Sequence, residues 1–570
     1  MKLAEYLFQR LRQLGVESIH GVPGDYNLSL LDFVEPAGLR WVGNVNELNA
    51  AYAADGYARI KGISALITTF GVGELSAINA IAGAYTERAP VIHIVGIPER
   101  ASHESRLLIH HTFNDGEYQR FAQMHAHATV AQTRLWDAHT SPQQIDNVLR
   151  QCLLHSRPVY LEVPVDLVTA IVPADSLQFP LDLLETSLGT REEAVLAEVH
   201  DRIRSAKQPL ILVDGEVRPM GVVAQVQELV DSTGWPTWTT PFGKGLLNET
   251  VPNFHGIYQG TYNQAKVREF HDTADLVLCF GPHWSSSNSY GYSSIPKSEI
   301  AIVFTDNAIH LNGHKYRDIS VKAVLQHILQ SLSQSSAHAY HKYPELPCDY
   351  KLPVPDIAET QLLAQDRLWR VLANILRPGD ILLGETGTAG YGVRVMPLPK
   401  HARVFTPVTW LSIGYMLPAA QGAALAQREL IESSNYFGLT RGRTILIIGD
   451  GSFQMTVQEL STIVRHDLNV LIILINNDGY TIERCIHGRK QGYNDVGRWR
   501  YLLAPSLFGA PDGTYLGSAR TFGELSRVMV DVEARNETGL AMVELFLDRE
   551  DAPAGPLRHY LEAQRSKEQK

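Results

Sequence analysis

The 570-residue sequence has few of the features that mark secreted, zinc-binding or nucleic-acid-binding proteins. Only four cysteines occur, and none forms a CxxC pair, which argues against a disulfide framework and against a zinc site. The 50 basic side chains face 61 acidic ones, which gives a net charge of −11, and no dense Lys/Arg run is present. We therefore expect no nucleic-acid partner, because a phosphate backbone is neutralised by clustered basic side chains.

Long apolar runs and a GxGxxG dinucleotide motif are also missing. The longest apolar run, 470–475, is far too short to cross a bilayer, so no membrane partner is expected. Without GxGxxG, a nicotinamide oxidoreductase is disfavoured. Residues 1–16 place leucines at helical spacing between charges, which is typical of a surface helix and not of a signal peptide. These features indicate a soluble, cytoplasmic protein.

The chain is too long for one hydrophobic core and divides into three α/β regions. Short apolar runs alternate with helical patterns, which predicts three doubly wound parallel-sheet domains. Pro- and Ser-rich stretches at 173–189 and 331–355 are the predicted linkers. The boundaries follow as 1–180, 190–335 and 357–550, with a C-terminal tail at 551–570. Buried strands are expected at 65–69, 91–95, 159–163, 210–213, 276–280, 300–304, 381–383, 444–448, 470–475 and 541–546.

Two strand ends in the third region carry the strongest chemical signal. The strand 444–448 runs into Gly449-Asp450-Gly451-Ser452, a Gly-rich turn before a helical pattern at 453–464, where backbone N–H groups can approach phosphate oxygens. The strand 470–475 runs into Asn476-Asn477-Asp478-Gly479-Tyr480. Neighbouring parallel strands end at the same sheet edge. Because Mg²⁺ prefers hard oxygen ligands, we predict that Asp450, the Asn477 amide and the Gly479 carbonyl bind it beside a diphosphate.

With this pair of motifs, the sequence resembles the thiamine diphosphate decarboxylases, in the pyruvate decarboxylase branch, over nearly its whole length. The resemblance implies a pyrimidine-binding (PYR) domain, a central domain and a diphosphate-binding (PP) domain, in that order. It implies thiamine diphosphate and Mg²⁺ as cofactors, a small 2-oxo acid as substrate, and a site between two subunits of a homodimer or a dimer of dimers. Further cofactor contacts are implied at Thr386, Thr388, Ile413, Tyr480 and Ile482, with Ile413 between the two cofactor rings.

The resemblance also assigns the acid–base residues. Glu47 matches the family's glutamate, whose carboxyl group hydrogen-bonds the aminopyrimidine so that its amino group can take the proton from the thiazolium carbon. Asp25, the tandem pair His110 and His111, and Glu483 match the set that manages protons during addition and product release. These five are the predicted catalytic residues. Gly73-Glu-Leu-Ser76 resembles the family's loop near the pyrimidine.

The identity of the 2-oxo acid stays open between pyruvate and larger acids. Thr386 favours pyruvate, whereas Ser289, near the position of a pocket-lining phenylalanine in yeast-type members, and Gly390-Tyr391 could admit phenylpyruvate, indolepyruvate or branched-chain acids. An acetolactate synthase-like carboligase and a silent regulatory paralogue are the rival functions. The first would lack the His110-His111 pair, and the second would have lost Glu47 or Asp450. The regulatory cysteine of yeast-type members aligns near Glu216, so activation through that thiol is not expected.

Overall fold

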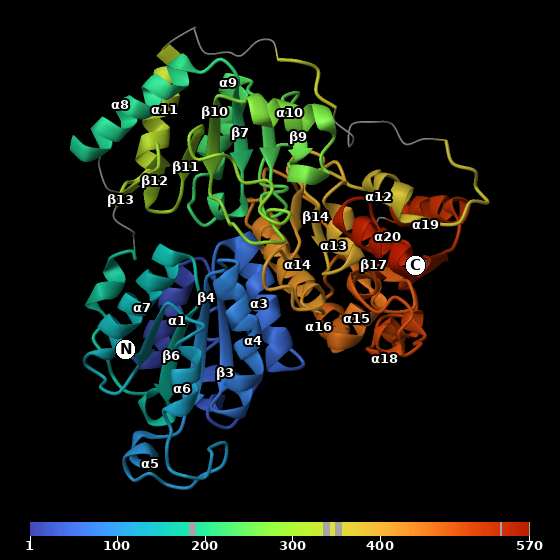
Figure 1. Cartoon of the computed structure of the whole chain (residues 1–570). Coiled ribbons are helices and arrows are strands. Elements are labelled where there is room, and N and C mark those ends of the chain that lie inside the picture. The colour runs from blue at the N-terminus through green and yellow to red at the C-terminus, as the bar shows by residue number, and fades with distance from the viewer. Residues whose placement is uncertain (182–189, 335–342, 348–355, 536–538, 569–570) are drawn as a thin grey trace.

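The computed structural model describes residues 1–181, 190–334, 343–347, 356–535 and 539–568, and these residues form three α/β domains (Figure 1). The predicted parallel sheets are confirmed, and each sheet is covered by helices on both faces. All ten predicted strands occur, with bounds within two residues of those expected. Apolar runs of β-branched residues therefore located the buried strands correctly.

The PYR domain holds a six-stranded parallel sheet in the order β2-β1-β3-β4-β6-β5. Its strands are β1 Ser18–Gly21, β2 Arg40–Trp41, β3 Ser64–Thr69, β4 Val91–Ile97, β5 Ala131–Arg134 and β6 Val159–Pro164. Its helices are α1 Leu3–Gln13, α2 Leu28–Leu31, α3 Glu47–Lys61, α4 Val72–Thr86, α5 Arg100–Glu104, α6 Arg120–His125 and α7 Ser141–His155. β1, β2 and β5 were not predicted, because they are short and carry polar residues.

The central domain holds a seven-stranded sheet in the order β13-β12-β11-β10-β7-β8-β9. Its strands are β7 Pro209–Val213, β8 Thr237–Thr239, β9 Phe254–Ile257, β10 Leu276–Phe280, β11 Ala301–Phe304, β12 Ala308–Leu311 and β13 His314–Arg317. Its helices are α8 Thr190–Ser205, α9 Val223–Thr233, α10 Ala265–Thr273 and α11 Val321–Gln334. β12 and β13 pair antiparallel at one edge, so this sheet is only partly parallel.

The PP domain holds a six-stranded parallel sheet in the order β15-β14-β16-β17-β19-β18. Its strands are β14 Ile381–Gly384, β15 Arg403–Phe405, β16 Thr444–Gly449, β17 Val470–Asn476, β18 Tyr515–Ala519 and β19 Ala541–Phe546. Its helices are α12 Gln365–Ala373, α13 Thr388–Val393, α14 Met416–Glu432, α15 Asp450–Thr456, α16 Leu460–Arg465, α17 Thr481–Ile486, α18 Ala504–Leu507, α19 Phe522–Ala534 and α20 Pro556–Glu568.

Three sequence-based expectations need correction or fall outside the described residues. The helix expected at 453–464 begins earlier, at Asp450, and a 3-10 turn at Val457–Glu459 separates α15 from α16. The start of the second predicted linker, 331–334, belongs to α11, and most of that linker lies outside the described residues. Residues 182–189 of the first linker also lie outside them. No helix among the described residues is long and apolar enough to span a membrane.

The PYR and PP domains of one chain share a hydrophobic core where α3 crosses α14 (Figure 1). Glycines allow the two backbones to approach closely. A Cβ atom on Gly422 would lie 1.9 Å from the Ala53 carbonyl oxygen, and one on Gly56 would lie 2.2 Å from that of Ala419. Backbone contacts this close have no room for a side chain. The crossing fixes the orientation of the two domains.

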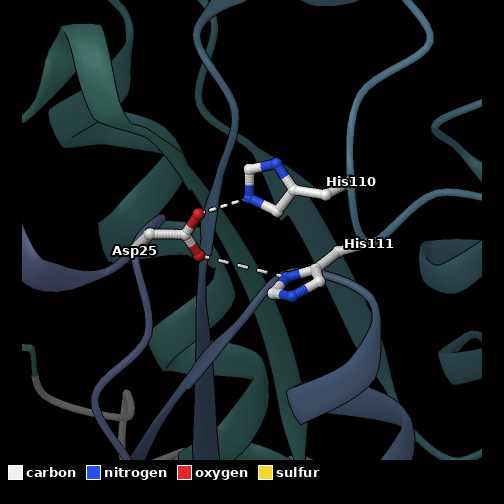
Figure 2. Close-up of side chains that lie close together, drawn as sticks. All are labelled: Asp25, His110 and His111. Carbon is white, nitrogen blue, oxygen red and sulfur yellow. Dashed lines mark hydrogen bonds and ion pairs between the residues drawn. The ribbon is translucent and has the colours of Figure 1, made fainter.

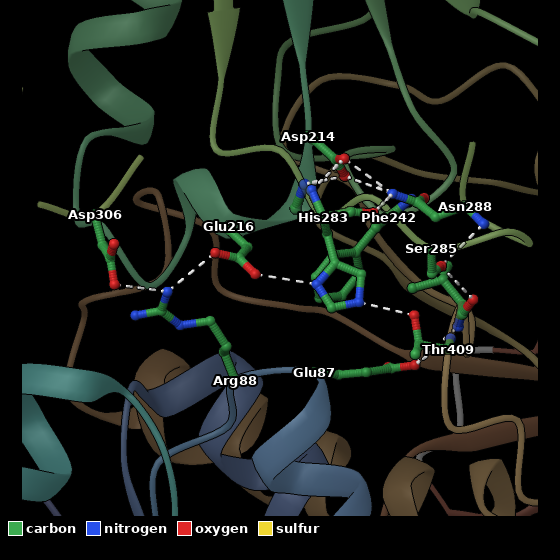
Figure 3. Close-up of polar contacts among 12 residues, drawn as sticks. Glu87, Arg88, Asp214, Glu216, Phe242, His283, Ser285, Asn288, Asp306 and Thr409 are labelled. Carbon is green, nitrogen blue, oxygen red and sulfur yellow. Dashed lines mark hydrogen bonds and ion pairs between the residues drawn. The ribbon is translucent and has the colours of Figure 1, made fainter. Parts of the chain in front are cut away.

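A polar network joins all three domains (Figure 3). From the PYR domain, the Arg88 guanidinium pairs with Glu216 and Asp306 of the central domain, both at 3.0 Å. Glu216 also accepts a 3.0 Å hydrogen bond from the His283 ring, whose Nε2 lies 2.8 Å from the Thr409 hydroxyl of the PP domain. Burial lowers the pKa of His283, but Glu216 and the neighbouring carboxylates outweigh this effect and raise it. Glu216, near which the regulatory cysteine of yeast-type members aligns, thus belongs to a charge network.

The neighbouring Glu87 attaches the PYR domain to the same PP loop. Its buried carboxylate accepts hydrogen bonds from the backbone N–H groups of Val408 and Thr409, at 2.9 and 3.0 Å, and pairs with Arg59 at 2.9 Å. Arg59, with the N–H donors, holds the pKa of Glu87 below its ordinary value against the opposing effect of burial. Because the loop leads to Ile413, the three-domain network anchors a segment that carries a predicted site residue.

Candidate active site

Asp25, His110 and His111 lie together in the PYR domain, as the sequence predicted (Figure 2). Asp25 follows β1, and the histidines lie on the loop after α5. One Asp25 oxygen is hydrogen-bonded to His110 Nε2, and the other lies 4.0 Å from His111 Nδ1. Their ligand atoms all fall within 4.8 Å of one another. A proton can therefore pass directly between Asp25 and His110, whereas His111 lies close by but beyond hydrogen-bond distance of Asp25.

Tyr26 is a member of this group that the sequence did not reveal. Its ring stacks on His110 with centroids 4.9 Å apart and packs edge-on against His111 at 5.9 Å. Burial is the largest of the effects that raise the pKa of its hydroxyl to about 12, so the phenol stays protonated. Its place next to Asp25 was the only available signal, and adjacency in sequence does not predict stacking.

Glu47 begins α3, directly after the N-cap residue Asn46, whose side chain accepts a 2.8 Å hydrogen bond from Asn49. This half-buried carboxylate has no hydrogen-bond partner among the described residues, and one of its oxygens faces Gly73. A Cβ atom at Gly73 would lie only 3.0 Å from that oxygen. Glycine therefore leaves the carboxylate accessible at the start of the helix.

Asp450, Asn477 and Gly479 converge at the carboxyl ends of β16 and β17. The buried Asp450 carboxylate accepts hydrogen bonds from the backbone N–H groups of Gly451, at 2.8 Å, and Gly479, at 3.0 Å. Burial raises its pKa to about 6. A cleft of about 650 Å³ opens beside it.

The Asn477 side chain suits a cation in one of its two amide orientations. One terminal atom of the amide lies 2.8 Å from the Gly479 carbonyl oxygen and 3.2 Å from Asp450 Oδ1. With nitrogen at that position the amide donates to both oxygens, and with oxygen there three oxygens face one another. Adjacent ligands of an octahedral Mg²⁺ at about 2.1 Å lie about 3 Å apart. The residues present therefore fit a magnesium ion.

The other predicted cofactor-binding residues surround these strand ends. Gly451 packs against Tyr480, because a Cβ there would lie 2.4 Å from that ring, while Gly449 and Ser452 flank Asp450 at the start of α15. Thr386 and Thr388 follow β14, and the Thr386 hydroxyl is buried without a hydrogen-bond partner among the described residues. Ile413 is half-buried before α14, as is Ile482 on α17. An unpartnered buried hydroxyl is what a bound ligand would satisfy.

Glu385, the residue before Thr386, was not among the predicted site residues, but it organises this part of the site. Its fully buried carboxylate accepts hydrogen bonds from the N–H groups of Thr386 at 2.7 Å and Met416 at 2.9 Å. It thereby ties the strand end of β14 to the start of α14. Burial raises its pKa to about 7. Ser289, considered for the substrate pocket, is buried, and its hydroxyl donates to the Ser285 carbonyl within its own loop.

Within one chain, the predicted residues form two separate groups. Asp25, Glu47, His110 and His111 belong to the PYR domain, whereas Asp450, Asn477 and Glu483 belong to the PP domain. Glu483 is exposed on α17. Among the described residues, no hydrogen bond or ion pair joins the two groups.

The comparisons with known proteins agree with this architecture. Three thiamine pyrophosphate enzyme domain models match the chain: the N-terminal TPP-binding domain at residues 1–125, the central domain at 196–332 and the C-terminal TPP-binding domain at 385–518. The structure is also similar to benzoylformate decarboxylase from Polynucleobacter necessarius, with a TM-score of 0.77 over 97% of this chain and 100% of that one. At 18% identity this similarity shows the fold.

Among sequences, a pyruvate decarboxylase of Aspergillus parasiticus is 55% identical over 97% of this chain and 96% of its own length. Pyruvate decarboxylase isozyme 1 of Saccharomyces cerevisiae is 39% identical over the same shares. Together with the three matching domains, these relatives show that the chain belongs to the thiamine pyrophosphate enzymes, in the pyruvate decarboxylase branch.

Proposed function

We propose that the protein catalyses the non-oxidative decarboxylation of pyruvate to acetaldehyde and CO₂, with thiamine diphosphate and Mg²⁺ as cofactors. The observation that carries the proposal is the meeting of the Asp450 carboxylate, the Asn477 amide and the Gly479 carbonyl at the ends of β16 and β17, with one terminal atom of the amide 2.8 and 3.2 Å from the other two groups. The pyruvate decarboxylases similar to this chain over 97% of its length support pyruvate as the substrate. The cytoplasm is the proposed compartment.

Each group of residues has a distinct part in this reaction. Asp450, Asn477 and Gly479 would hold Mg²⁺ against the diphosphate, and Thr386 would offer its buried hydroxyl to the cofactor. The bound cofactor supplies a nucleophilic carbon and an electron sink for the bond that loses CO₂. Glu47 would hold a proton on the pyrimidine nitrogen, while Asp25, His110, His111 and Glu483 would move protons at the substrate oxygen and carbon.

A second copy of the chain would complete the site. Among the described residues of one chain, no hydrogen bond or ion pair joins the PYR-domain group to the metal-binding group, so each would serve a site shared with the partner. A homodimer is the smallest assembly that satisfies this arrangement, and a dimer of dimers contains it twice.

Product analysis tests the reaction. The purified protein, supplied with thiamine diphosphate, Mg²⁺ and pyruvate, should release acetaldehyde and CO₂ in equal amounts. Acetolactate as the main product would instead identify a carboligase. Values of kcat/KM for pyruvate, phenylpyruvate and 2-oxoisocaproate should be highest for pyruvate. A higher value for either larger acid would overturn the substrate assignment and leave the reaction class intact.

The Asp450→Asn variant tests the metal site. Replacing the carboxylate by an amide removes one negative ligand, so we expect the Mg²⁺ concentration for half-maximal activity to rise by about tenfold or more. Asp512→Asn, which makes the same change at an exposed position of the same domain, is the matched control and should leave it unchanged. An unchanged Mg²⁺ requirement in the Asp450 variant would contradict the assignment.

A further inference from the structure

Glu74 is a buried acidic residue that lies behind the turn between Glu47 and His111. The turn comprises Gly71 and Gly73 at the start of α4. A Cβ atom on Gly71 would lie 2.2 Å from the His111 carbonyl oxygen, and one on Gly73 would lie 3.0 Å from the Glu47 carboxylate. The turn therefore touches His111 on one side and Glu47 on the other, and its position sets the spacing between them.

Glu74 holds this turn through a direct hydrogen bond. One of its carboxyl oxygens accepts from the Gly71 N–H at 2.8 Å. Gly71 has φ of +70° and ψ of −96°, a conformation that glycine adopts readily and other residues do not. Since Gly71 has no side chain to pack, it is held by this hydrogen bond, by the 3.0 Å hydrogen bond from the Leu75 N–H to its carbonyl oxygen, and by the contact with His111. Loss of the hydrogen bond to Glu74 would let the turn relax.

The other oxygen of Glu74 is held from the sheet. The Tyr160 hydroxyl on β6 lies 2.7 Å from it and 3.3 Å from Glu162. Tyr160 also stacks on His125, with ring centroids 5.0 Å apart. Glu74, Tyr160, Glu162 and His125 are all buried, so the cluster is shielded from water and its geometry is fixed by packing.

The pKa values in this cluster indicate that Glu74 is protonated and neutral. Burial raises the pKa of Glu74 to about 8 and that of Glu162 to about 7. Arg134 lies 3.6 Å from Glu162 and offsets that charge. His125 Nε2 lies 3.7 Å from Glu74, but burial lowers the His125 pKa to about 4. Glu74 therefore has no charged partner at neutral pH and keeps its proton, so a glutamine could reproduce its shape and hydrogen bonds.

We propose that Glu74 is a positioning residue of the active site, which holds the Gly71–Gly73 turn from behind and thereby sets the separation of Glu47 and His111. It touches neither substrate nor cofactor and acts through the turn. The inference rests on the proposed function, because Glu47 and His111 have their roles only there. A shift of about 1 Å in a catalytic group can cost about a hundredfold in rate, so the effect of losing this support is measurable.

Three variants of the full-length holoenzyme test the proposal. Glu74→Ala should lower kcat by about a hundredfold while the KM for pyruvate and the affinity for thiamine diphosphate change by less than about threefold. The near-ultraviolet circular dichroism band of the imino tautomer of the bound pyrimidine should be lost, because Glu47 would no longer be aligned with the ring. Glu74→Gln should restore kcat to within about threefold of the wild type. Tyr160→Phe, which removes a single hydroxyl, should lower kcat about fivefold. Because this change is small, the variant should fold and test the proposal even if Glu74→Ala does not fold.

Asp146→Asn is the control for stability alone. Asp146 is a buried carboxylate of the same domain, paired with Arg10 at 2.7 Å on α1, away from the turn. Its loss should lower the melting temperature as Glu74→Ala does, but leave kcat and the dichroism band unchanged.

The proposal is overturned if Glu74→Ala retains kcat and the band, if Glu74→Gln is as impaired as Glu74→Ala, or if Asp146→Asn loses as much of both. Failure of the proposed function would look different, because wild-type protein would then form no acetaldehyde. The dichroism band and cofactor affinity would still report on Glu74 in that case.

Discussion

Glu47 combines three local features that suit an acid facing a ligand. It begins a helix, it lies beside a glycine that leaves room, and it has no hydrogen-bond partner among the described residues. A carboxylate inside a protein usually has such a partner, and leaving it without one has a cost in stability. Its placement is therefore best explained by the proposed role at the pyrimidine.

Replacing Glu47 should stop turnover without preventing cofactor binding. We expect Glu47→Ala to lower kcat about a thousandfold, since the proton at the pyrimidine nitrogen would have no donor. Titration of cofactor binding, followed by the quenching of protein fluorescence, should give an affinity close to that of the wild type. Glu17→Ala, an exposed acidic residue of the same domain, is the control and should keep full activity. Substantial turnover in the Glu47 variant would refute its assignment.

Individual site residues differ in how far the sequence could predict them. Asp450, Asn477 and Gly479 follow apolar strands, and the rule that parallel strands end at one edge brought them together correctly. The contact between Asp25 and the two histidines came only from the family resemblance, since 85 residues separate the partners. The roles of Tyr26, Glu74 and Glu385 were not predicted, although Glu74 lies within the Gly73–Ser76 motif, because these roles depend on burial and on partners distant in sequence.

At the scale of elements, the crossing of α3 and α14 depends on two glycines that have no Cβ to separate the backbones. Gly422→Ala would place a methyl group 1.9 Å from the Ala53 carbonyl oxygen, which cannot move without its helix. We expect a loss of about 1–3 kcal/mol in the free energy of unfolding, measured by urea denaturation. Helix propensity alone would predict a small gain, so the sign of the change decides between the two effects.

Gly513→Ala is the control for this substitution. No atom lies within 4 Å of the place where its Cβ would be, so stability should change by less than about 0.5 kcal/mol. Equal stability of the Gly422 variant and the control would show that the helices can move apart without cost.

The last helix, α20, packs on α17, which carries Glu483. Gln564 donates hydrogen bonds to the carbonyl oxygens of Arg484 and Cys485, at 2.7 and 2.6 Å, and so caps the end of α17. The sequence predicted only a C-terminal tail at 551–570, of which residues 556–568 form α20. Its helical pattern was too polar to indicate what it covers, and the partners lie 80 residues away.

In the whole molecule, a few charged side chains connect the central domain to its neighbours. Glu216→Ala removes the acceptor that Arg88 and His283 share, and it leaves the buried Arg88 with one charged partner, the exposed Asp306, and the His155 carbonyl oxygen. We expect the central domain to unfold separately, so that calorimetry shows two transitions where the wild type shows one. Asp306→Ala removes the exposed partner of the same arginine and should cost less than about 1 kcal/mol. A single transition in the Glu216 variant would show that the domains are joined by other contacts.

Stability should also depend on pH in a defined direction. Burial raises the pKa of Glu74 to about 8 and those of Glu162, Glu385 and Glu459 to about 7. The folded chain therefore keeps protons on these side chains at pH values where the unfolded chain, whose glutamates have the ordinary pKa of 4.5, has released them. Four histidines have the opposite effect on stability below pH 6.5, because burial lowers their pKa values to about 3 or 4 and the unfolded chain then binds protons that the folded chain does not. These are His20, His103, His125 and His271. Above pH 6.5 the buried carboxyl groups and His283, whose pKa is also raised, act in the same direction, so stability falls as pH rises from 6.5 to 8.

Melting temperatures at a fixed scan rate check this expectation. The value at pH 6.5 should exceed that at pH 8, and Glu74→Gln should reduce the difference because the largest single contribution is removed. A melting temperature that rises over this interval would contradict the assignment of protonated buried carboxyl groups.

The two groups of site residues lie on different domains without mutual contact, and this separation has a genetic consequence. If each site takes its acid from one chain and its metal ligands from the other, a mixed dimer of Glu47→Ala and Asp450→Asn chains has one doubly damaged site and one intact site. At a Mg²⁺ concentration too low to support activity of the Asp450→Asn chain alone, random pairing of the two variant chains should then restore about a quarter of normal activity. Such intragenic complementation would not occur if one chain built the whole site.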